Sequence, residues 1–171
     1  RLTASYGPGD NWVHQGRGAT TGYWVNTAAD SVRVWRVTES GSTGVFAHYS
    51  GDSLYATGQL YKTITADENG HQLIEFKDRE GNVLLKKVQC SAAADTGAGE
   101  GYTGWLCTYY VYDSLNLLRA VIQPVGVQLL DANSWNINAL SGVILTEQCF
   151  RYEYDGKRRM IIKQVPGAGP V

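Results

Sequence analysis

The sequence of 171 residues has little methionine, little phenylalanine and few cysteines. One Met and three Phe leave eleven Tyr and five Trp to supply most of the aromatic surface. The cysteines Cys90, Cys107 and Cys149 are widely spaced, without the Cys-x-x-Cys or Cys/His spacing of a zinc site. We therefore expect free thiols. The alternative, a Cys90–Cys107 bridge, requires an oxidising compartment.

An excess of charge of one sign is also missing. Fifteen basic and sixteen acidic side chains nearly balance, and no basic stripe indicates a nucleic-acid partner. No apolar run is long enough to predict a membrane span, and no motif predicts a cofactor. The chain begins at Arg1 without a signal-peptide pattern and ends just after a glycine-rich turn. These two ends predict a piece of a longer protein.

Glycine and tyrosine are abundant, and together they favour short strands joined by tight turns. Alternating apolar residues predict strands over 30–37 and 45–49. The clearest region is 59–89, where two turns separate three strand patterns and predict an antiparallel meander. The expected fold is therefore mainly β, built from antiparallel hairpins and meanders.

The C-terminal half is predicted to contain two further hairpins with an insertion between them. Residues 124–148 are the only stretch with helical spacing, which predicts one or two short helices there, with Asn136 as an N-cap. The predicted organisation is an irregular N-terminal segment, a meander region, a Gly/Ala-rich loop, and two hairpins with the helical insertion: residues 1–22, 23–89, 90–104 and 105–171.

Four predicted turns begin with aspartate. An Asp carboxylate can accept backbone N–H bonds from residues that follow it, and a glycine in the fourth position tolerates a positive φ. The predicted turn-forming residues are Asp67 and Gly70, Asp78 and Gly81, Asp113 and Asn116, and Asp155, with Arg158 in the fourth place of the last turn.

Aromatic residues precede these turns. In the last two hairpins, Tyr occupies the positions one and three before the aspartate, and side chains two apart share one face of a strand. In stacked hairpins such rows would align and stabilise one another across strands. The predicted repeat aromatics are Phe76, Tyr110, Tyr112, Tyr152 and Tyr154.

The unit Tyr-x-Tyr-Asp-x-x-(Gly/Asn/Arg)-x-(Leu/Met) resembles the YD repeat of Rhs-type proteins, most clearly at 110–113 and 150–155. Residues 58–86 are similar to the region that precedes the repeats in Rhs-like proteins of Bacteroidetes-type bacteria. The resemblance covers 23–171. It implies a secreted or cell-surface bacterial protein whose stacked hairpins form a β-sheet shell around a C-terminal toxin or other cargo. Such a wall needs no catalytic residue, and the irregular spacing of the turns places this chain near the start of an array.

A second hypothesis is a carbohydrate- or protein-binding β module of a cell-surface protein. Trp12 and Trp135 lie in loop-like sequence and are the candidate ligand-stacking residues, whereas Trp35 and Trp105 lie in alternating strands and are expected to pack. The expected partners are the remainder of a longer repeat chain or a partner protein along exposed strand edges, and in the second hypothesis a glycan.

An enzyme has the least support, and we expect neither a catalytic nor a metal site. His14, His48 and His71 are far apart, and none belongs to a metal-binding motif. Two pairs of neighbouring carboxylates, Asp67 with Glu68 and Asp78 with Glu80, could serve acid/base chemistry or bind calcium. Turn geometry already accounts for both aspartates.

Overall fold

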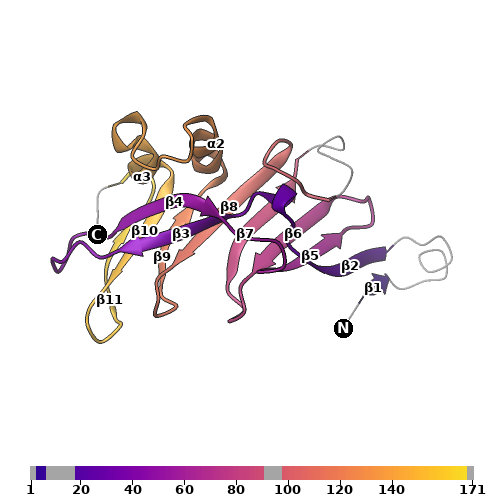
Figure 1. The fold of residues 1–171 in the computed structure, drawn as a ribbon, viewed down its shortest axis with the longest axis horizontal. Helices are drawn as coiled ribbons and strands as arrows, with labels where there is room; N and C mark the ends of the chain where they lie inside the picture. The colour runs from indigo at the N-terminus through magenta and orange to yellow at the C-terminus, as the bar shows by residue number, and fades with distance from the viewer. Residues whose placement is uncertain (1–2, 7–17, 91–97, 169–171) are drawn as a thin grey trace. The chain divides into compact units, whose positions relative to one another are not determined.

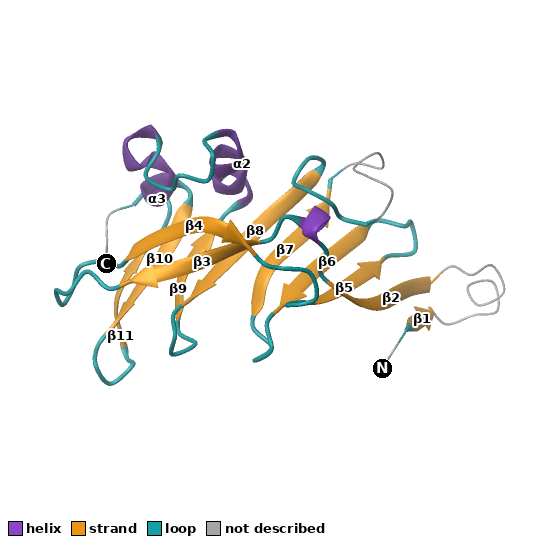
Figure 2. Cartoon of the chain, viewed as in Figure 1, coloured by secondary structure: helices purple, strands orange, loops and turns teal. Residues whose placement is uncertain are grey.

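The structure, a computed structural model, describes residues 3–6, 18–90 and 98–168. It is mainly β, with a nine-stranded antiparallel sheet, a separate two-stranded hairpin and two short α-helices (Figures 1 and 2). The strands are β1 (Ala4–Tyr6), β2 (Gly18–Val25), β3 (Arg33–Thr38), β4 (His48–Leu54), β5 (Tyr61–Ala66), β6 (Gln72–Lys77), β7 (Val83–Gln89), β8 (Trp105–Tyr112), β9 (Leu118–Ile122), β10 (Cys149–Tyr154) and β11 (Met160–Gln164). The helices are α2 (Pro124–Ala132) and α3 (Val143–Glu147), with short 3-10 turns η1 (Ala28–Asp30) and η2 (Leu140–Gly142).

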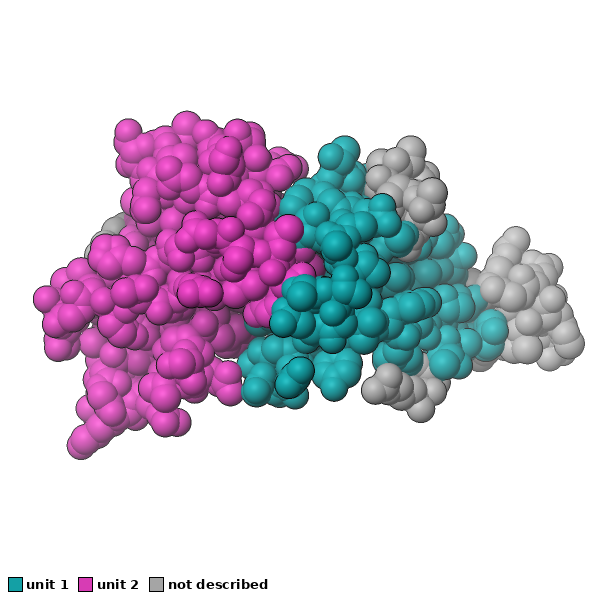
Figure 3. Space-filling model, in the orientation of Figure 1, with its two compact units in different colours: residues 1–31, 56–106 teal, residues 32–55, 107–171 magenta. Residues whose placement is uncertain are grey.

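The chain divides into two compact units, each built from two separate stretches (Figure 3). Unit 1 consists of residues 1–31 and 56–106, and unit 2 of residues 32–55 and 107–171. This division differs from the linear organisation expected from the sequence, because 32–55 leaves the meander region and joins the C-terminal stretch. The sequence holds no local signal for such a pairing, which rests on contacts between residues far apart in the chain.

Unit 1 contains the strand order β1-β2-β5-β6-β7. Strands β5, β6 and β7 pair as consecutive antiparallel neighbours, which confirms the meander predicted over 59–89. Ile74, Phe76 and Leu85 are fully buried on one face of these strands, here called the inner face of unit 1. Loop residues cover this face, and an added side chain at Gly99 would collide with Ile74.

The sequence predicted an irregular segment over 1–22, but part of this segment forms strands. Ala4–Tyr6 pairs with Gly18–Thr20, and β2 continues along β5 from Thr20↔Ala66 to Val25↔Tyr61. Small and hydroxyl-bearing residues dominate this strand, so it lacks the apolar alternation that marks a half-buried strand. The neighbouring strand, and not local periodicity, makes these residues extended.

Unit 2 contains the order β8-β9-β10-β11, and the β3–β4 hairpin lies across these strands (Figure 1). Hydrogen bonds from backbone N–H groups and a tyrosine hydroxyl tie the hairpin to the strands. Arg33 N donates to the Tyr109 hydroxyl at 2.8 Å, Ala47 N to Glu153 Oε1 at 2.7 Å, and the Tyr49 hydroxyl to the Arg119 carbonyl at 3.2 Å. The face of β8–β10 beneath the hairpin is the inner face of unit 2.

Both α-helices fall within 124–148, as predicted, but the second is shorter than its sequence pattern indicated. Asn136 does not cap it, because the Asn136 side chain accepts the N–H of Asn138 at 3.0 Å and forms a local turn instead. Leu140 and Ser141 have left-handed φ of 55° and 56°, so the helix begins only at Val143. No helix in the described residues is long and apolar enough to cross a membrane.

Candidate functional site

The four predicted aspartate turns share one hydrogen-bond pattern. The Asp N–H donates to the carbonyl four residues later, and the N–H three residues later donates back to the Asp carbonyl. Asp Oδ1 then accepts the N–H four residues later at 2.8 or 2.9 Å. The residue in the fourth place is left-handed in every turn, with φ of 84° at Gly70, 90° at Gly81, 60° at Asn116 and 62° at Arg158.

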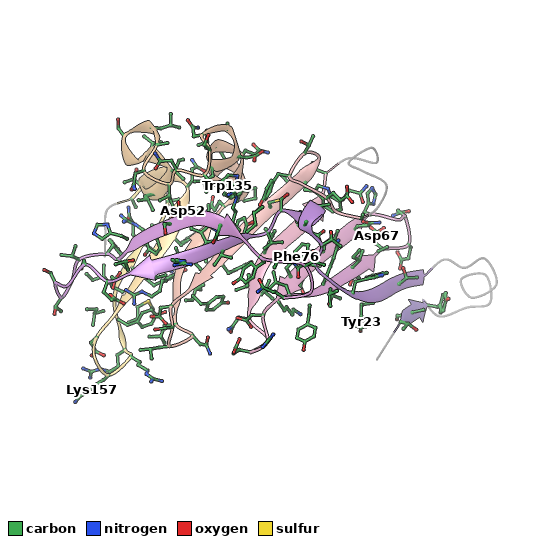
Figure 4. All side chains as sticks on the ribbon, in the orientation of Figure 1. Tyr23, Asp52, Asp67, Phe76, Trp135 and Lys157 are labelled. Carbon is green, nitrogen blue, oxygen red and sulfur yellow. The ribbon has the colours of Figure 1, made fainter. Side chains whose placement is uncertain are left out.

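Asp67, Asp78, Asp113 and Asp155 each begin a turn of this geometry. In Figure 4, Asp67 and Lys157 both lie at turns between paired strands. Hydrogen bonds from backbone N–H groups hold the carboxyl pKa of Asp67 and of Asp155 below its ordinary value. The strongest of these bonds comes from His71 for Asp67 and from Arg159 for Asp155. The charged carboxylate is therefore part of the turn.

Tyr110 and Tyr152 of the last two hairpins lie on the face opposite the β3–β4 hairpin, the outer face of unit 2. Tyr110 pairs across the strands with Val121, and Val121 pairs with Phe150 on β10. Because direct partners and residues two apart share a face, Tyr110, Tyr152 and Phe150 lie on one surface. These aromatics are neither buried nor fully exposed, so the row forms a half-covered aromatic surface.

Phe76 is not a member of such a row. It lies two positions before Asp78, whereas the tyrosines lie one and three positions before their aspartates. A shift of one residue moves a side chain to the other face of a strand. Phe76 is therefore fully buried on the inner face of unit 1, as Val111 and Glu153 are at the equivalent positions of unit 2.

A buried arginine organises the inner face of unit 2. Arg119 Nη1 contacts Glu39 Oε1 at 2.7 Å and Asp113 Oδ2 at 3.0 Å, and Nη2 contacts Glu153 Oε2 at 2.6 Å. Burial alone would lower the pKa of Arg119, but hydrogen bonds to Glu39, Glu153 and Asp113 outweigh it and raise the pKa. The guanidinium stays charged and joins the β3–β4 hairpin, a turn aspartate and β10.

Two buried lysines organise the inner face of unit 1. Lys62 Nζ lies 2.5 Å from Asp30 Oδ1 and also donates to the Ala98 carbonyl. Lys87 Nζ donates to the carbonyls of Asp30, Gly99 and Gly101 at 3.2, 2.7 and 2.6 Å. Each ammonium lies 5.4 Å from the Phe76 ring centre. These bonds attach the 28–30 turn and the 98–101 loop to the sheet.

Of the two candidate ligand-stacking residues, Trp12 and Trp135, the structure describes only Trp135. Trp135 is 4% exposed and packs against Tyr109 and Trp35 at ring-centre distances of 5.8 and 6.4 Å, with the Arg33 guanidinium 4.7 Å from its ring centre. This burial favours a packing role for Trp135 over the predicted role in ligand stacking. Trp12 lies outside the described residues, and Trp105 is buried as expected.

The cysteines and histidines form no cluster in the described part of the chain. None of the three cysteines forms a disulfide, and Cys107 and Cys149 are buried whereas Cys90 is exposed. No group of three or more His, Cys, Asp or Glu side chains among the described residues has an arrangement suited to a metal ion. His71 Nδ1 lies 3.3 Å from Asp67 Oδ2 on the surface, beside the turn that precedes β6. His14 lies outside the described residues.

The sequence interpretation missed the buried cations. Lys62 lies two residues from Leu60 and two from Ile64, so all three side chains share one face of the strand. This shared face with two apolar residues indicated that Lys62 points inward. Arg119 had no such signal, because a register shift in the β8–β9 pair between Val111 and Tyr112 displaces it to the inner face.

Comparisons with protein-family models, with curated proteins and with solved structures find no match to this chain.

Proposed function

We propose that this chain is a structural β-sheet segment of a larger assembly, in which hairpins pair edge to edge with further strands of a longer repeat chain or of a partner protein. The observation that supports the proposal most strongly is the repeated aspartate turn, formed four times with one hydrogen-bond pattern. A repeated hairpin unit is typical of architectures in which each unit is stabilised by its neighbours.

The arrangement of unit 2 supports this role. Its inner face is covered by the β3–β4 hairpin, whereas its outer face carries half-covered tyrosines. Among the described residues β11 pairs only with β10, so one edge of this strand is open. Met160 and Ile161 of β11 are 54% and 41% exposed, and a single lysine, Lys163, is its only charge. Edge strands of proteins that stay monomeric are usually protected by charge, proline or a bulge. In β11 these are limited to Lys163 and a register shift at its start, after which Ile162, Lys163 and Gln164 pair regularly with β10.

The resemblance to YD-repeat proteins gives this proposal its particular form. A hairpin segment of a shell wall, in a secreted or cell-surface bacterial protein, would require the turns, the tyrosine rows and an edge that accepts the next strand. On the inner face of each unit, the buried cations bond to backbone carbonyls and carboxylates of the same unit. The buried charges thus support the fold of their own unit.

The edge can be tested by sedimentation velocity on the 171-residue chain over a range of concentrations. We expect concentration-dependent association that Ile161→Lys weakens strongly, because a charge on the edge strand opposes pairing. Val125→Lys is the matched control, since Val125 is 53% exposed but lies on α2. A chain that stays monomeric at all concentrations, or association that both variants weaken equally, would contradict edge pairing.

A further inference from the structure

Unit 1 holds a pocket that the structural role does not use. It has a volume of about 550 Å³ and lies on the inner face beside the loop residues Thr27, Ala98 and Glu100. Its floor is formed by β2, β5 and the start of β6. A pocket of this size, with apolar walls and a few polar groups, is typical of sites for small molecules.

The main apolar surface in the pocket is the indole of Trp24. Trp24 pairs directly with Lys62 across β2 and β5, so both side chains lie on the inner face. A side chain at Gly22 would collide with the six-membered ring of Trp24, which shows that the indole rests on bare backbone at Gly22. Trp24 is nevertheless 54% exposed. Its ring is thus held by the strand on one side while more than half of its surface remains open.

Polar groups surround this ring. Gln72 lines the pocket, and its Oε1 is buried without a hydrogen-bond partner among the described residues. The backbone of Gln72 is held in place by a bond from its N–H to Gln89 Oε1 at 3.0 Å. A buried amide oxygen without a partner costs free energy, which the Gln72 side chain would recover by turning this oxygen toward a ligand hydroxyl in the pocket. The hydroxyls of Thr20 and Thr27 and the Glu100 carboxylate add further polar groups to the lining.

The charge of the pocket excludes a strongly anionic ligand. The Lys62 ammonium at the floor is neutralised by Asp30 at 2.5 Å and also donates to the Ala98 carbonyl. Glu100 at the rim is exposed and acidic. A phosphate or carboxylate group would therefore meet no uncompensated cation among the described lining residues and would lie near a carboxylate.

From this geometry we propose that the Trp24 pocket binds a neutral pyranose sugar. A pyranose presents a flat C–H face suited to the open indole, and hydroxyl groups around its rim suited to the Gln72 amide, the threonine hydroxyls and Glu100. The site differs from both tryptophans singled out in the sequence, Trp12 and Trp135. It requires no association of the chain and is independent of the edge pairing proposed above.

The test uses the 171-residue chain on a glycan microarray, followed by saturation-transfer NMR with methyl glycosides of the sugars that bind. We expect Trp24→Ala to weaken binding roughly tenfold or more, equivalent to about 1.4 kcal/mol, and Gln72→Leu to weaken it less. Tyr61→Ala is the matched control, because Tyr61 is also 54% exposed but pairs with Val25 on the opposite face of the sheet. That variant should bind as the unchanged chain does.

Circular dichroism of each variant separates loss of binding from loss of fold. In a second approach, Gly22→Val should displace the indole from its resting place and weaken sugar binding while leaving Trp24 in the chain. An array without any bound glycan would overturn the proposal, as would glycan binding that Trp24→Ala leaves intact. Binding of aromatic peptides at Trp24 without a glycan response would also overturn it, by assigning the pocket to a protein ligand.

Discussion

Arg119 offers the sharpest test of how unit 2 is held together. Arg119→Leu removes a guanidinium that is 4% exposed and leaves its carboxylate partners without their cation. The side chains of Glu153 and Asp113 are 6% and 9% exposed, so water cannot readily replace the lost bonds. Glu39 is 64% exposed and is expected to contribute little.

The expected loss follows from these exposures. Removing one partner of a buried ion pair costs about 3–5 kcal/mol, because the remaining charge stays buried and unpaired. We therefore expect Arg119→Leu to lower the free energy of unfolding by about 3–5 kcal/mol. Glu153→Gln in the same chain should recover part of this loss by removing the buried charge, and a double-mutant cycle would measure the coupling between the two positions.

Urea unfolding followed by tryptophan fluorescence measures these values, since Trp35 and Trp135 both lie in unit 2. Arg159→Leu is the control. Arg159 also pairs with an aspartate, Asp155, at 2.6 Å, but is 73% exposed, so its loss should be much smaller. A cost of Arg119→Leu below about 1 kcal/mol, in the range of an exposed pair, would refute the argument. Equal costs for the two variants would refute it too.

Three further predictions concern single groups. Burial raises the pKa of Cys149 to about 12 and Cys107 is also buried, so a thiol reagent should modify only Cys90 in the folded chain and all three cysteines after unfolding. Arg158→Gly should raise the free energy of unfolding by about 0.5–1 kcal/mol, because a left-handed non-glycine residue costs roughly 1–2 kcal/mol and glycine's extra freedom when unfolded offsets part of that gain. Backbone hydrogen bonds lower the pKa of Asp67 in the folded state. The contribution of its carboxylate to the stability of the turn is therefore complete above the ordinary pKa of 3.8, and it is lost as the pH falls through the lower pKa of the folded state. Hydrogen exchange of the His71 amide across this range measures that loss.

Each of these has a matched control. Cys90→Ser should abolish labelling of the folded chain, and persistent labelling would show that a buried thiol is accessible. Gly156→Ala lies in the same turn as Arg158 at a glycine without positive φ and with open space around it, so it should not destabilise the chain. A loss of stability with Arg158→Gly would argue against strain at that position. Asp67→Asn should remove the acid dependence of His71 exchange, and an unchanged pH profile would contradict the role of the carboxylate.

The hairpin turns could be predicted from sequence because their determinants are local. An aspartate bonds to N–H groups two to four residues away, and the left-handed residue follows three positions later, so the whole motif lies within five residues. The meander over 59–89 could be predicted for the same reason, since consecutive strands joined by such turns pair with each other. Two turns have a non-glycine residue in the left-handed place, Asn116 and Arg158, and of these two residue types only asparagine adopts this conformation readily.

The sequence by itself determined the β class, the aspartate turns and the tyrosine rows, all of which depend on spacings of a few residues. Tertiary structure alone decided the division into two units, the strand formed by 18–25 and the partners of the buried cations Lys62, Lys87 and Arg119. Most of the partners involved lie between 12 and 80 residues away, such as Asp30 for Lys62 and Glu39 for Arg119, and only Asp113 lies as close as six residues from Arg119. Local periodicity can place Lys62 on an inward face, but it carries no information about distant partners, so the contacts that neutralise the buried cations form only when the chain folds.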